Sequence, residues 1–333
     1  KDAGADAVRL RVVAQADAAV TALVDRVRRA AGLATDQAAR QVDDALAEAT
    51  SELRLVKDAW EVDQLQAAVD ATKAGFDNLI RSIPRAKGHW RGERVLEGAF
   101  GARAREEGNG LGYETIAAAG DHANTLHWIN NDGPVEPGQL VLVDAGVEVD
   151  SLYTADVTRT IPVDGRFTTA QRRVYEAVLE AADAAFARAG TPGCRFKDVH
   201  AAAMEVIAAR LEEWGMLPEG VSAADSLGPE GQYHRRWMVH GTSHHLGLDV
   251  HDCAQARREM SMDAELVPGM VFTIEPGLYF KADDQLIPQE LRGIGVRIED
   301  DVLVTADGHR NLSADMPRTS ADVEAWIARV QQG

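Results

Sequence analysis

Four acidic side chains interrupt segments whose other residues are typical of β-strands. They are Asp144, Asp156, Glu275 and Glu299, within the strand-like runs 139–149, 153–163, 270–280 and 295–305. A carboxylate buried on a strand is costly unless it is paired, hydrogen-bonded or bound to a metal. One such residue would indicate only a strand end or an exposed face, but four of them favour a shared site.

Four of the ten histidines lie within a dozen positions of one another. They are His240, His244, His245 and His251. Clustered carboxylates cannot all ionise without cations, so four of them together with one imidazole predict divalent metal. Such oxygen-rich ligation suits Mn²⁺, with Co²⁺, Fe²⁺ and Zn²⁺ as alternatives. A carboxylate that bridges two ions about 3.5 to 4 Å apart would activate a shared water as a nucleophile, which is hydrolase chemistry.

A hairpin is expected to bring two of these carboxylates together. If 141–149 pairs with 152–161 through a turn centred on Asp150, Asp144 lies directly opposite Asp156 on the same face. In the last strand, a period of two places Arg297 on the same face as Glu299, where it can orient a site carboxylate.

Amphipathic helices interleave with these strands and predict an α+β fold with antiparallel neighbours. Apolar residues at three- and four-residue spacing predict a long helix from Glu52 to Ile83 that stops at Pro84. Further helices are predicted over 92–107, 170–188 and 197–214, and Thr168 or Thr169 is the expected cap of the helix over 170–188. The segment 215–231 is the least regular internal one.

The composition argues against nucleic-acid and membrane partners. With 53 acidic and 35 basic residues, the net charge of −18 repels phosphate backbones and anionic lipids. No apolar run approaches the roughly 20 residues that span a bilayer, and no basic leader precedes a short apolar segment. The two cysteines, Cys194 and Cys253, lie far apart, which favours a reducing compartment. We therefore expect a cytoplasmic protein.

Five separated motifs resemble, in order and residue type, those of dinuclear-metal peptidases with the pita-bread fold. They are VDAG at 143–146, DVTRT at 156–160, HGTSHHLGLDVHD at 240–252, IEPGLY at 274–279 and GVRIEDDV at 295–302. Within that group the chain is most similar to the Xaa-Pro aminopeptidases, also called aminopeptidase P. The resemblance covers roughly Glu52 to the C-terminus and implies a curved antiparallel sheet covered by helices.

The resemblance implies a role for each motif residue. The implied metal ligands are Asp144, Asp156, His244, Glu275 and Glu299, with Asp156 and Glu299 bridging and Glu275 also shuttling protons. The implied substrate-contacting residues are His127, His240 and His251, with Tyr279 as a candidate transition-state contact and Arg297 as an arginine behind the ligands. Neither His245 nor Cys253 has a role that the resemblance assigns.

The implied activity is removal of the N-terminal residue from peptides with proline in second position, by hydroxide activated between two divalent ions. Proline has no N–H, so peptidases that recognise that donor fail and a specialised pocket is needed. A homo-oligomer, dimer or tetramer, is also implied. Prolidase, which cleaves Xaa-Pro dipeptides with the same ligands, stays an alternative, as does a non-catalytic peptide-binding domain. Methionine aminopeptidases lack a histidine placed like His240, and creatinase-like enzymes lack the metal ligands.

Two features depart from the family pattern. The spacing from Asp144 to Asp156 exceeds the usual one by a residue, which predicts an odd loop or a bulge between Val147 and Tyr153. Residues 1–51 resemble only the end of the N-terminal domain that usually precedes the catalytic one. We therefore expect 1–51 to be a remnant of that domain with a linker, and 52–333 to form the catalytic domain.

Overall fold

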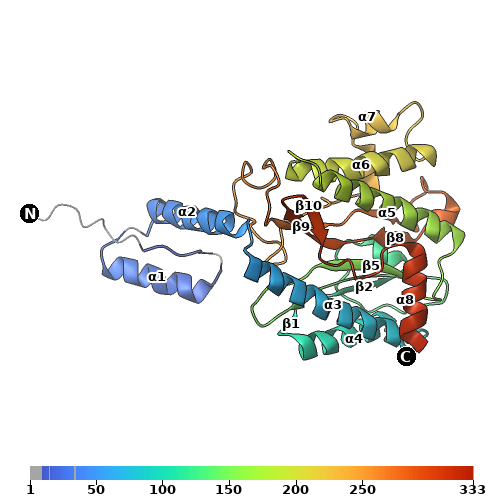
Figure 1. The fold of residues 1–333 in the computed structure, drawn as a ribbon, viewed down its shortest axis with the longest axis horizontal. Helices are drawn as coiled ribbons and strands as arrows, with labels where there is room; N and C mark the ends of the chain where they lie inside the picture. The colour runs from blue at the N-terminus through green and yellow to red at the C-terminus, as the bar shows by residue number, and fades with distance from the viewer. Residues whose placement is uncertain (1–9, 15, 34, 333) are drawn as a thin grey trace, which may run out of the picture.

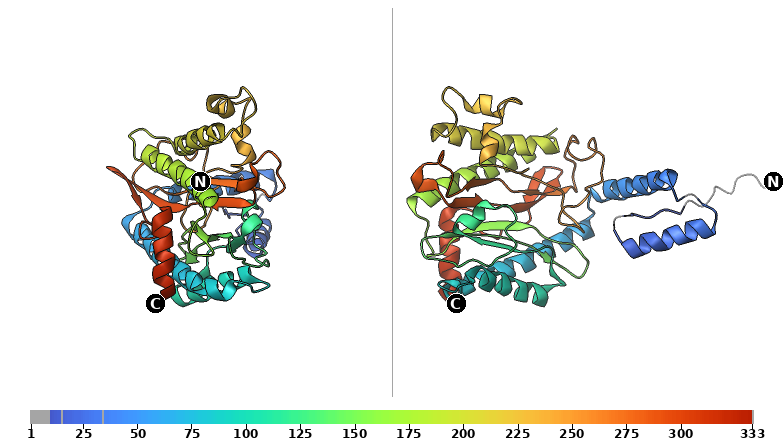
Figure 2. Two further views of the ribbon diagram at one scale, coloured as in Figure 1. Left: turned by 90° about the vertical axis from the view of Figure 1, so that its right-hand side faces the viewer. Right: turned by 180° about the vertical axis from the view of Figure 1, so that it is seen from behind.

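Short strands lie between two layers of helices in the computed structural model, which describes residues 10–14, 16–33 and 35–332. The helices are α1 (Ala18–Ala30), α2 (Gln37–Arg54), α3 (Ala59–Ala86), α4 (Gly92–Glu107), α5 (Thr169–Ala189), α6 (Phe196–Glu213), α7 (Ala223–Leu227) and α8 (Ser320–Gln332). Helices α5 and α6 cover one side of the strands, and α3 and α4 cover the other (Figures 1 and 2). In the described residues, no helix is both long and apolar enough to cross a membrane.

Every strand pair among the described residues is antiparallel. The strands are β1 (Gly110–Leu111), β2 (Ile116–Ala119), β3 (Leu140–Ala145), β4 (Val147–Glu148), β5 (Val157–Pro162), β6 (Val271–Ile274), β7 (Gly277–Phe280), β8 (Ile294–Arg297), β9 (Asp300–Thr305) and β10 (Gly308–Asn311). They pair in the orders β2–β3–β5, β10–β9–β6, β7–β8 and β1–β4. The Glu299 N–H donates to the Thr158 carbonyl and so joins β5 to the C-terminal strands. The α+β, antiparallel prediction is confirmed.

Three predicted helices match the structure closely. Helix α4 has the predicted bounds, and α5 and α6 differ from prediction by one residue at each end. Thr168 is the N-cap of α5, and it forms a capping box with Gln171. These helices were predictable because their apolar periodicity and caps are local signals.

The predicted helix from Glu52 to Ile83 is wrong at both ends. Helix α2 runs to Arg54, and α3 starts only after Asp58, whose side chain forms a capping box with Glu61. Pro84 lies inside α3 near its end. A proline in the last turn removes one intrahelical donor, and the Ile80 carbonyl left free accepts from the Gln331 side chain at 3.4 Å.

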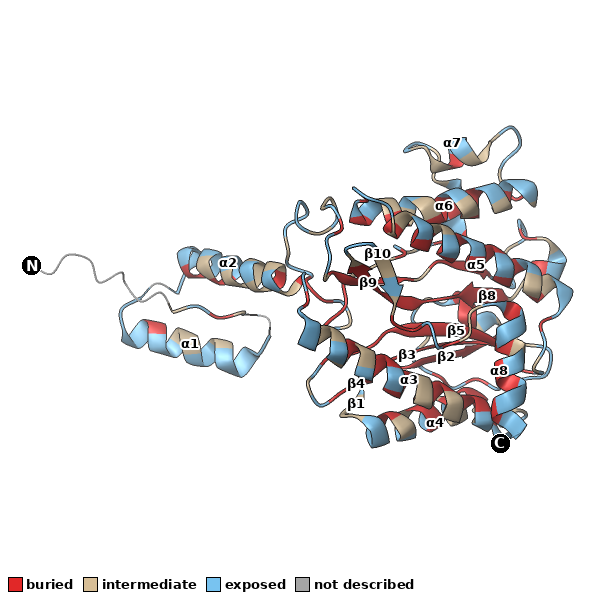
Figure 3. Cartoon of the chain, in the orientation of Figure 1, coloured by how far each residue is buried: buried red, intermediate tan, exposed pale blue. Residues whose placement is uncertain are grey.

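Sequence patterns missed the C-terminal helix and several short strands. Helix α8 was not predicted, yet its Trp326 is fully buried against Phe76 of α3, with ring centroids 6.3 Å apart. Strands β1, β2 and β10 were also missed, and the segment 215–231 contains the short α7. Figure 3 shows that most strands are buried, β10 being an exception, whereas α1 and α2 are largely exposed.

The hairpin that carries the two aspartates has the predicted odd loop but a different register. Three residues, 150–152, connect the paired Val149 and Tyr153, and Leu152 has a positive φ of 70°. Because the loop is centred on Ser151 and not on Asp150, Asp144 pairs with Thr158, and the prediction that it faces Asp156 is wrong. The two carboxylates are diagonal neighbours on one face, a spacing that side chains still bridge.

Gly146 is expected to tolerate no side chain. A Cβ there would lie 1.7 Å from the Ala155 carbonyl oxygen, across the hairpin. Replacement by Ala must push the two strands apart, so Gly146→Ala is expected to lower the free energy of unfolding by about 1 to 3 kcal/mol or more. Urea unfolding measures this change. The control is Gly98→Ala on the exposed face of α4, where a Cβ meets nothing within 4 Å and the change is expected to stabilise the helix slightly.

Candidate metal centre and catalytic cavity

One cavity of about 490 Å³ collects nearly all of the predicted site residues. The five predicted ligands Asp144, Asp156, His244, Glu275 and Glu299 line it, together with His127, His240, His251 and Arg297. Tyr279 is not part of this wall, because it lies behind His240. A volume of this size suits a small ligand such as a short peptide end.

The five acidic and histidine side chains reach the cavity from five different segments. Asp144 is on β3, Asp156 directly precedes β5, His244 is in the loop 240–252, Glu275 follows β6 and Glu299 lies between β8 and β9. The loop 240–252 is held against β6, since the His244 N–H donates to the Thr273 hydroxyl and the Thr273 N–H donates to the His244 carbonyl. The site therefore depends on contacts between the β2–β3–β5 strands, which carry Asp144, and the β10–β9–β6 strands, which Glu275 follows.

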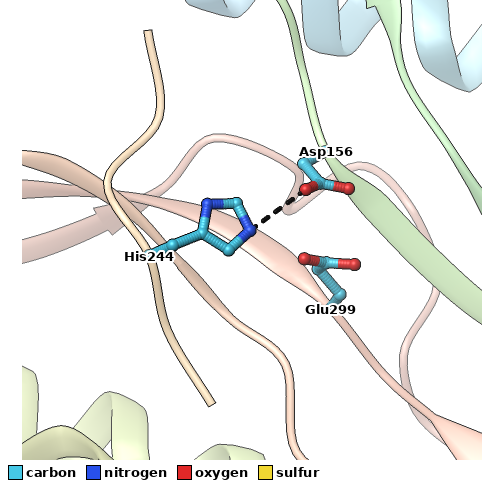
Figure 4. Close-up of side chains that lie close together, drawn as sticks. All are labelled: Asp156, His244 and Glu299. Carbon is cyan, nitrogen blue, oxygen red and sulfur yellow. Dashed lines mark ion pairs between the residues drawn. The ribbon is translucent and has the colours of Figure 1, made fainter. Parts of the chain in front are cut away.

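Three of these side chains meet the geometric requirement for a common cation. Ligand atoms of Asp156, His244 and Glu299 all lie within 4.8 Å of one another. The close-up in Figure 4 shows the three pointing toward one another, with His244 Nε2 at 3.2 Å from Asp156 Oδ2. The same His244 Nε2 lies 3.5 Å from a Glu275 oxygen.

The carboxylates repel one another and are removed from water. Burial, together with the charges of neighbouring carboxylates, raises the pKa of Asp156 and raises that of Glu299 well above its usual range. Burial likewise raises the pKa of Glu275 to about 7. For His244 burial opposes the charged form, but the hydrogen bond that its ring donates to Asp156 and the charge of Glu275 outweigh burial and raise the pKa to about 9.

These residues fit divalent cations. The carboxyl groups concentrate negative charge in a place where it is poorly solvated, and the one arginine in the cluster, Arg297, is bonded to Asp144. The imidazole of His244 supplies one nitrogen donor among carboxylate oxygens. Such a donor set matches Mn²⁺-like ions better than ions that prefer thiolate ligands. Two cations would offset the repulsion between the carboxylates, which raises the pKa of Asp156 and Glu299.

Tyr113 and Thr158 support the carboxylates and were missed by sequence reasoning. The Tyr113 hydroxyl lies 2.6 Å from Asp144 Oδ1 and also contacts Asp156. The Thr158 hydroxyl donates to Glu299 at 2.6 Å and accepts from Arg297 Nε at 3.0 Å. No local pattern marks Tyr113, but Thr158 lies two residues after Asp156, and the period of a strand places it on the same face.

Removing the Tyr113 hydroxyl is expected to weaken the site without unfolding the protein. Tyr113→Phe leaves the ring in place but takes away the group that touches both aspartates. Residues behind metal ligands typically contribute roughly 10- to 100-fold to metal affinity or activity, and we expect a loss in that range. Metal content after dialysis and the rate of peptide hydrolysis measure it. Unchanged values for both would show that the hydroxyl does not orient the carboxylates.

A chain of hydrogen bonds fixes His240. Arg297 Nη1 donates to the Tyr279 hydroxyl at 3.0 Å, the hydroxyl lies 2.7 Å from His240 Nε2, and His240 Nδ1 lies 2.7 Å from the Gly241 carbonyl. Burial, reinforced by the Arg297 charge, lowers the pKa of His240 to about 3, so the ring is neutral. Both of its nitrogens are engaged within the protein in this arrangement.

The other clustered histidines differ in their surroundings. His251 is exposed on the cavity wall, with its ring 4.4 Å from that of His244, and His127 is a second exposed histidine of the lining. His245 is buried, stacks on Phe196 with centroids 4.6 Å apart, and has no hydrogen-bond partner for either ring nitrogen among the described residues. His245 is therefore a core side chain.

The loop 240–252 is tied to the segment between α2 and α3 by a buried ion pair. Asp252 Oδ2 lies 3.3 Å from Lys57 Nζ, and both side chains are almost fully buried. Arg54 Nη2 lies 3.0 Å from the other oxygen of Asp252. This contact fixes the residue next to His251 to the junction of α2 and α3.

Comparison of the sequence with known families gives a match to "Metallopeptidase family M24" over residues 63–306. The chain is 52% identical over 322 residues to "Xaa-Pro aminopeptidase 2" of Streptomyces coelicolor, a span of 97% of this chain and 64% of the relative. It is 36% identical over 274 residues to "Xaa-Pro aminopeptidase 3" of Homo sapiens, covering 82% of this chain and 51% of that protein. The chain thus spans about two thirds or less of the length of these relatives.

Comparison with solved structures gives the same grouping. Aminopeptidase P from Escherichia coli with the inhibitor Pro-Leu superposes with a TM-score of 0.77 at 33% identity, covering 86% of this chain and 63% of that one. The expected pita-bread fold is thereby confirmed. The matched region contains all the segments that line the cavity.

Proposed function

Since the chain belongs to metallopeptidase family M24, we propose that it is a metal-dependent exopeptidase that releases the N-terminal residue from peptides with proline in second position. The observation that carries this proposal is the convergence of four carboxylates, His244, three further histidines and Arg297 on one peptide-sized cavity. The 52% identity to Xaa-Pro aminopeptidases of Streptomyces supports the substrate class.

We propose that Asp144, Asp156, His244, Glu275 and Glu299 would hold two divalent cations. Mn²⁺ is the ion we propose, with Co²⁺, Fe²⁺ and Zn²⁺ as alternatives. The grouping of Asp156, His244 and Glu299 and the excess of buried carboxylates support this assignment. When bound, the ions would activate water for attack and polarise the scissile carbonyl.

The side chains around the cations are proposed to handle the proton and the substrate. Glu275, whose carboxylate oxygens lie 3.5 Å from His240 Nδ1 and from His244 Nε2, is proposed to shuttle a proton from water to the leaving nitrogen. His127, His240 and His251, which line the cavity, are proposed to contact the substrate. Tyr279 is proposed to orient His240 from behind, since its hydroxyl bonds that ring and is itself held by Arg297.

Prolidase activity is the second candidate, because that enzyme would use the same ligands. The experiment compares an Xaa-Pro-Yaa tripeptide with the matching Xaa-Pro dipeptide on Mn²⁺-loaded protein. Faster cleavage of the tripeptide supports the aminopeptidase, and preference for the dipeptide moves the assignment to prolidase. Binding of Mn²⁺ and peptide by calorimetry without cleavage of either would support a non-catalytic peptide-binding domain.

We further propose that residues 1–51 belong to a separate unit that precedes the catalytic domain. In Figures 1 and 2, α1 and α2 stand apart from the body of the molecule. The buried Arg28–Asp43 pair joins these two helices to each other, and the M24 match starts only at residue 63. The boundary falls within α2, which continues to Arg54.

A homo-oligomer and a cytoplasmic location complete the proposal. Both cysteines are free and buried, in keeping with a reducing compartment. Light scattering of the purified protein measures its mass and tests the oligomer.

A further inference from the structure

One buried carboxylate outside the metal cluster is hydrogen-bonded to four residues of a single segment of the cavity wall. Glu93, near the start of α4, has no exposed surface and accepts four hydrogen bonds. Its Oε1 accepts from the Ala119 N–H at 2.8 Å and lies 2.7 Å from His122 Nδ1. Its Oε2 accepts from Trp128 Nε1 at 2.9 Å and from the Gly133 N–H at 2.7 Å.

All four donors belong to the segment 119–133, which contains little regular structure beyond a single turn of 3₁₀-helix at Gly120–Asn124. Glu93 also binds this segment through its own backbone, because its N–H donates to the Gly133 carbonyl. The rings of His122 and Trp128 stack with centroids 3.8 Å apart, so the two side-chain donors brace each other. The carboxylate therefore closes the segment into a fixed loop.

This loop forms one wall of the catalytic cavity. Leu126, His127 and Ile129 line it, and they flank Trp128, whose indole is anchored on Glu93. His127 is exposed and has no hydrogen bond of its own among the described residues that would fix its ring. Its position therefore depends on the backbone on either side, which Glu93 holds.

The cost of burying the Glu93 carboxylate favours a role in holding the loop over a role in general packing. A buried carboxylate is costly unless its oxygens are fully hydrogen-bonded, and among the described residues no lysine or arginine pairs with Glu93. Its charge is stabilised by the loop donors themselves. Charge-assisted bonds of this kind are stronger than neutral ones, so the loop is held more tightly than an amide or a hydroxyl would hold it.

We propose that Glu93 is a positioning residue that fixes the loop 119–133 and thereby sets His127 against the substrate. The role in catalysis rests on the proposed function. Glu93 lies outside the cavity lining and acts only through the loop. Geometry errors of about 1 Å in a cavity wall cost up to roughly 100-fold in rate, and losing this anchor would produce errors of that kind.

The test combines Glu93→Gln with His127→Ala in a double-mutant cycle on the metal-loaded protein. The glutamine keeps the volume, but its amide nitrogen faces two of the four donors, so half of the bonds are lost. We expect kcat/KM for an Xaa-Pro-Yaa tripeptide to fall roughly 10- to 100-fold in the wild-type background. In the His127→Ala background the same change should cost no more than about twofold, because the group that it positions is gone.

Hydrogen exchange supplies a readout that does not need activity. Amides of 119–133 are expected to exchange faster in Glu93→Gln, while those of 240–252 and the metal content stay as in the wild type. Trp128→Phe removes one donor but keeps the stacking on His122, and it should give a smaller change confined to the same segment. Glu97→Gln is the matched control on α4, since Glu97 makes no ion pair among the described residues.

Two results would overturn the proposal. Equal losses from Glu93→Gln in both backgrounds would mean that Glu93 does not act through His127. Faster exchange throughout the protein would mean that it only stabilises the fold. If the wild type cleaves no Xaa-Pro peptide at all, the proposed function fails, and the exchange pattern alone then decides whether Glu93 holds the loop.

Discussion

Replacing Glu299 by Gln is expected to abolish metal-dependent hydrolysis while leaving the metal-free protein at least as stable as the wild type. Burial and the charges of Asp156 and Glu275 raise the pKa of Glu299 well above its usual range, so the ionised group is unfavourable without cations. A neutral amide removes that repulsion and can still accept the hydrogen bond from Thr158. The same amide loses the charge needed to share two cations.

The loss of activity in Glu299→Gln should exceed the roughly 10- to 100-fold that is typical for residues behind metal ligands. The melting temperature with and without Mn²⁺ separates the two effects. A ligand at 100 times its Kd stabilises the folded state by about 2.7 kcal/mol, so the wild type should gain stability with Mn²⁺ and the variant should gain much less. Glu290→Gln, on the exposed turn Gln289–Leu291, is the control. A variant that keeps the wild-type Mn²⁺ shift would show that Glu299 is not a ligand.

Arg159→Met is expected to be the most destabilising single change outside the metal site. Arg159 is fully buried, and it donates to the carbonyls of Pro317, Met316 and Glu299 and to Asp300 Oδ1 at 2.6 to 3.0 Å. It thereby joins β5 to β9 and to the segment before α8. Without it, the buried charge of Asp300 keeps one ionic partner among the described residues, Arg318 at 2.7 Å, and the hydrogen bond from the Ser313 hydroxyl at 2.6 Å.

Breaking a buried ion pair by removing one partner typically costs about 3 to 5 kcal/mol, and we expect a loss of that size from urea unfolding of Arg159→Met. The comparison is Arg210→Met, whose guanidinium is partly exposed and pairs with Glu180 and Glu213 on the surface. Surface pairs contribute about 0 to 1 kcal/mol, so this variant should unfold nearly as the wild type does. Equal losses of unfolding free energy in the two variants would show that the buried hydrogen bonds and ion pair of Arg159 do not stabilise the fold.

Local signals explain which elements were predictable. The bounds of α4, α5 and α6 follow from apolar periodicity and from the Thr168 cap, all within one stretch of chain. Strand β2 has the sequence IAAA, in which Ile116 is the one β-branched residue, and it forms because β3 pairs with it and the core covers it. Helix α8 depends similarly on a distant partner, since Trp326 finds its place only against α3.

The site was predictable as a set of residues but not as a geometry. The motifs placed five candidate ligands, and all of them line the cavity. The predicted register between Asp144 and Asp156 was wrong because moving the centre of the loop by one residue moves every cross-strand partner by two residues. No residue type between Val149 and Tyr153 indicates where the loop is centred. Tyr113 and Glu93 were missed because each acts on groups far away in sequence.

The most direct test of the central claim is release of the N-terminal residue from an Xaa-Pro-Yaa tripeptide by protein stripped with a chelator and then reloaded with Mn²⁺. The same peptide with alanine in place of proline is the control. The proposed dinuclear Xaa-Pro aminopeptidase predicts no cleavage after stripping, recovery at close to two Mn²⁺ per chain, and strong preference for the proline peptide. Undiminished cleavage by the stripped protein, or equal cleavage of the two peptides, would contradict it.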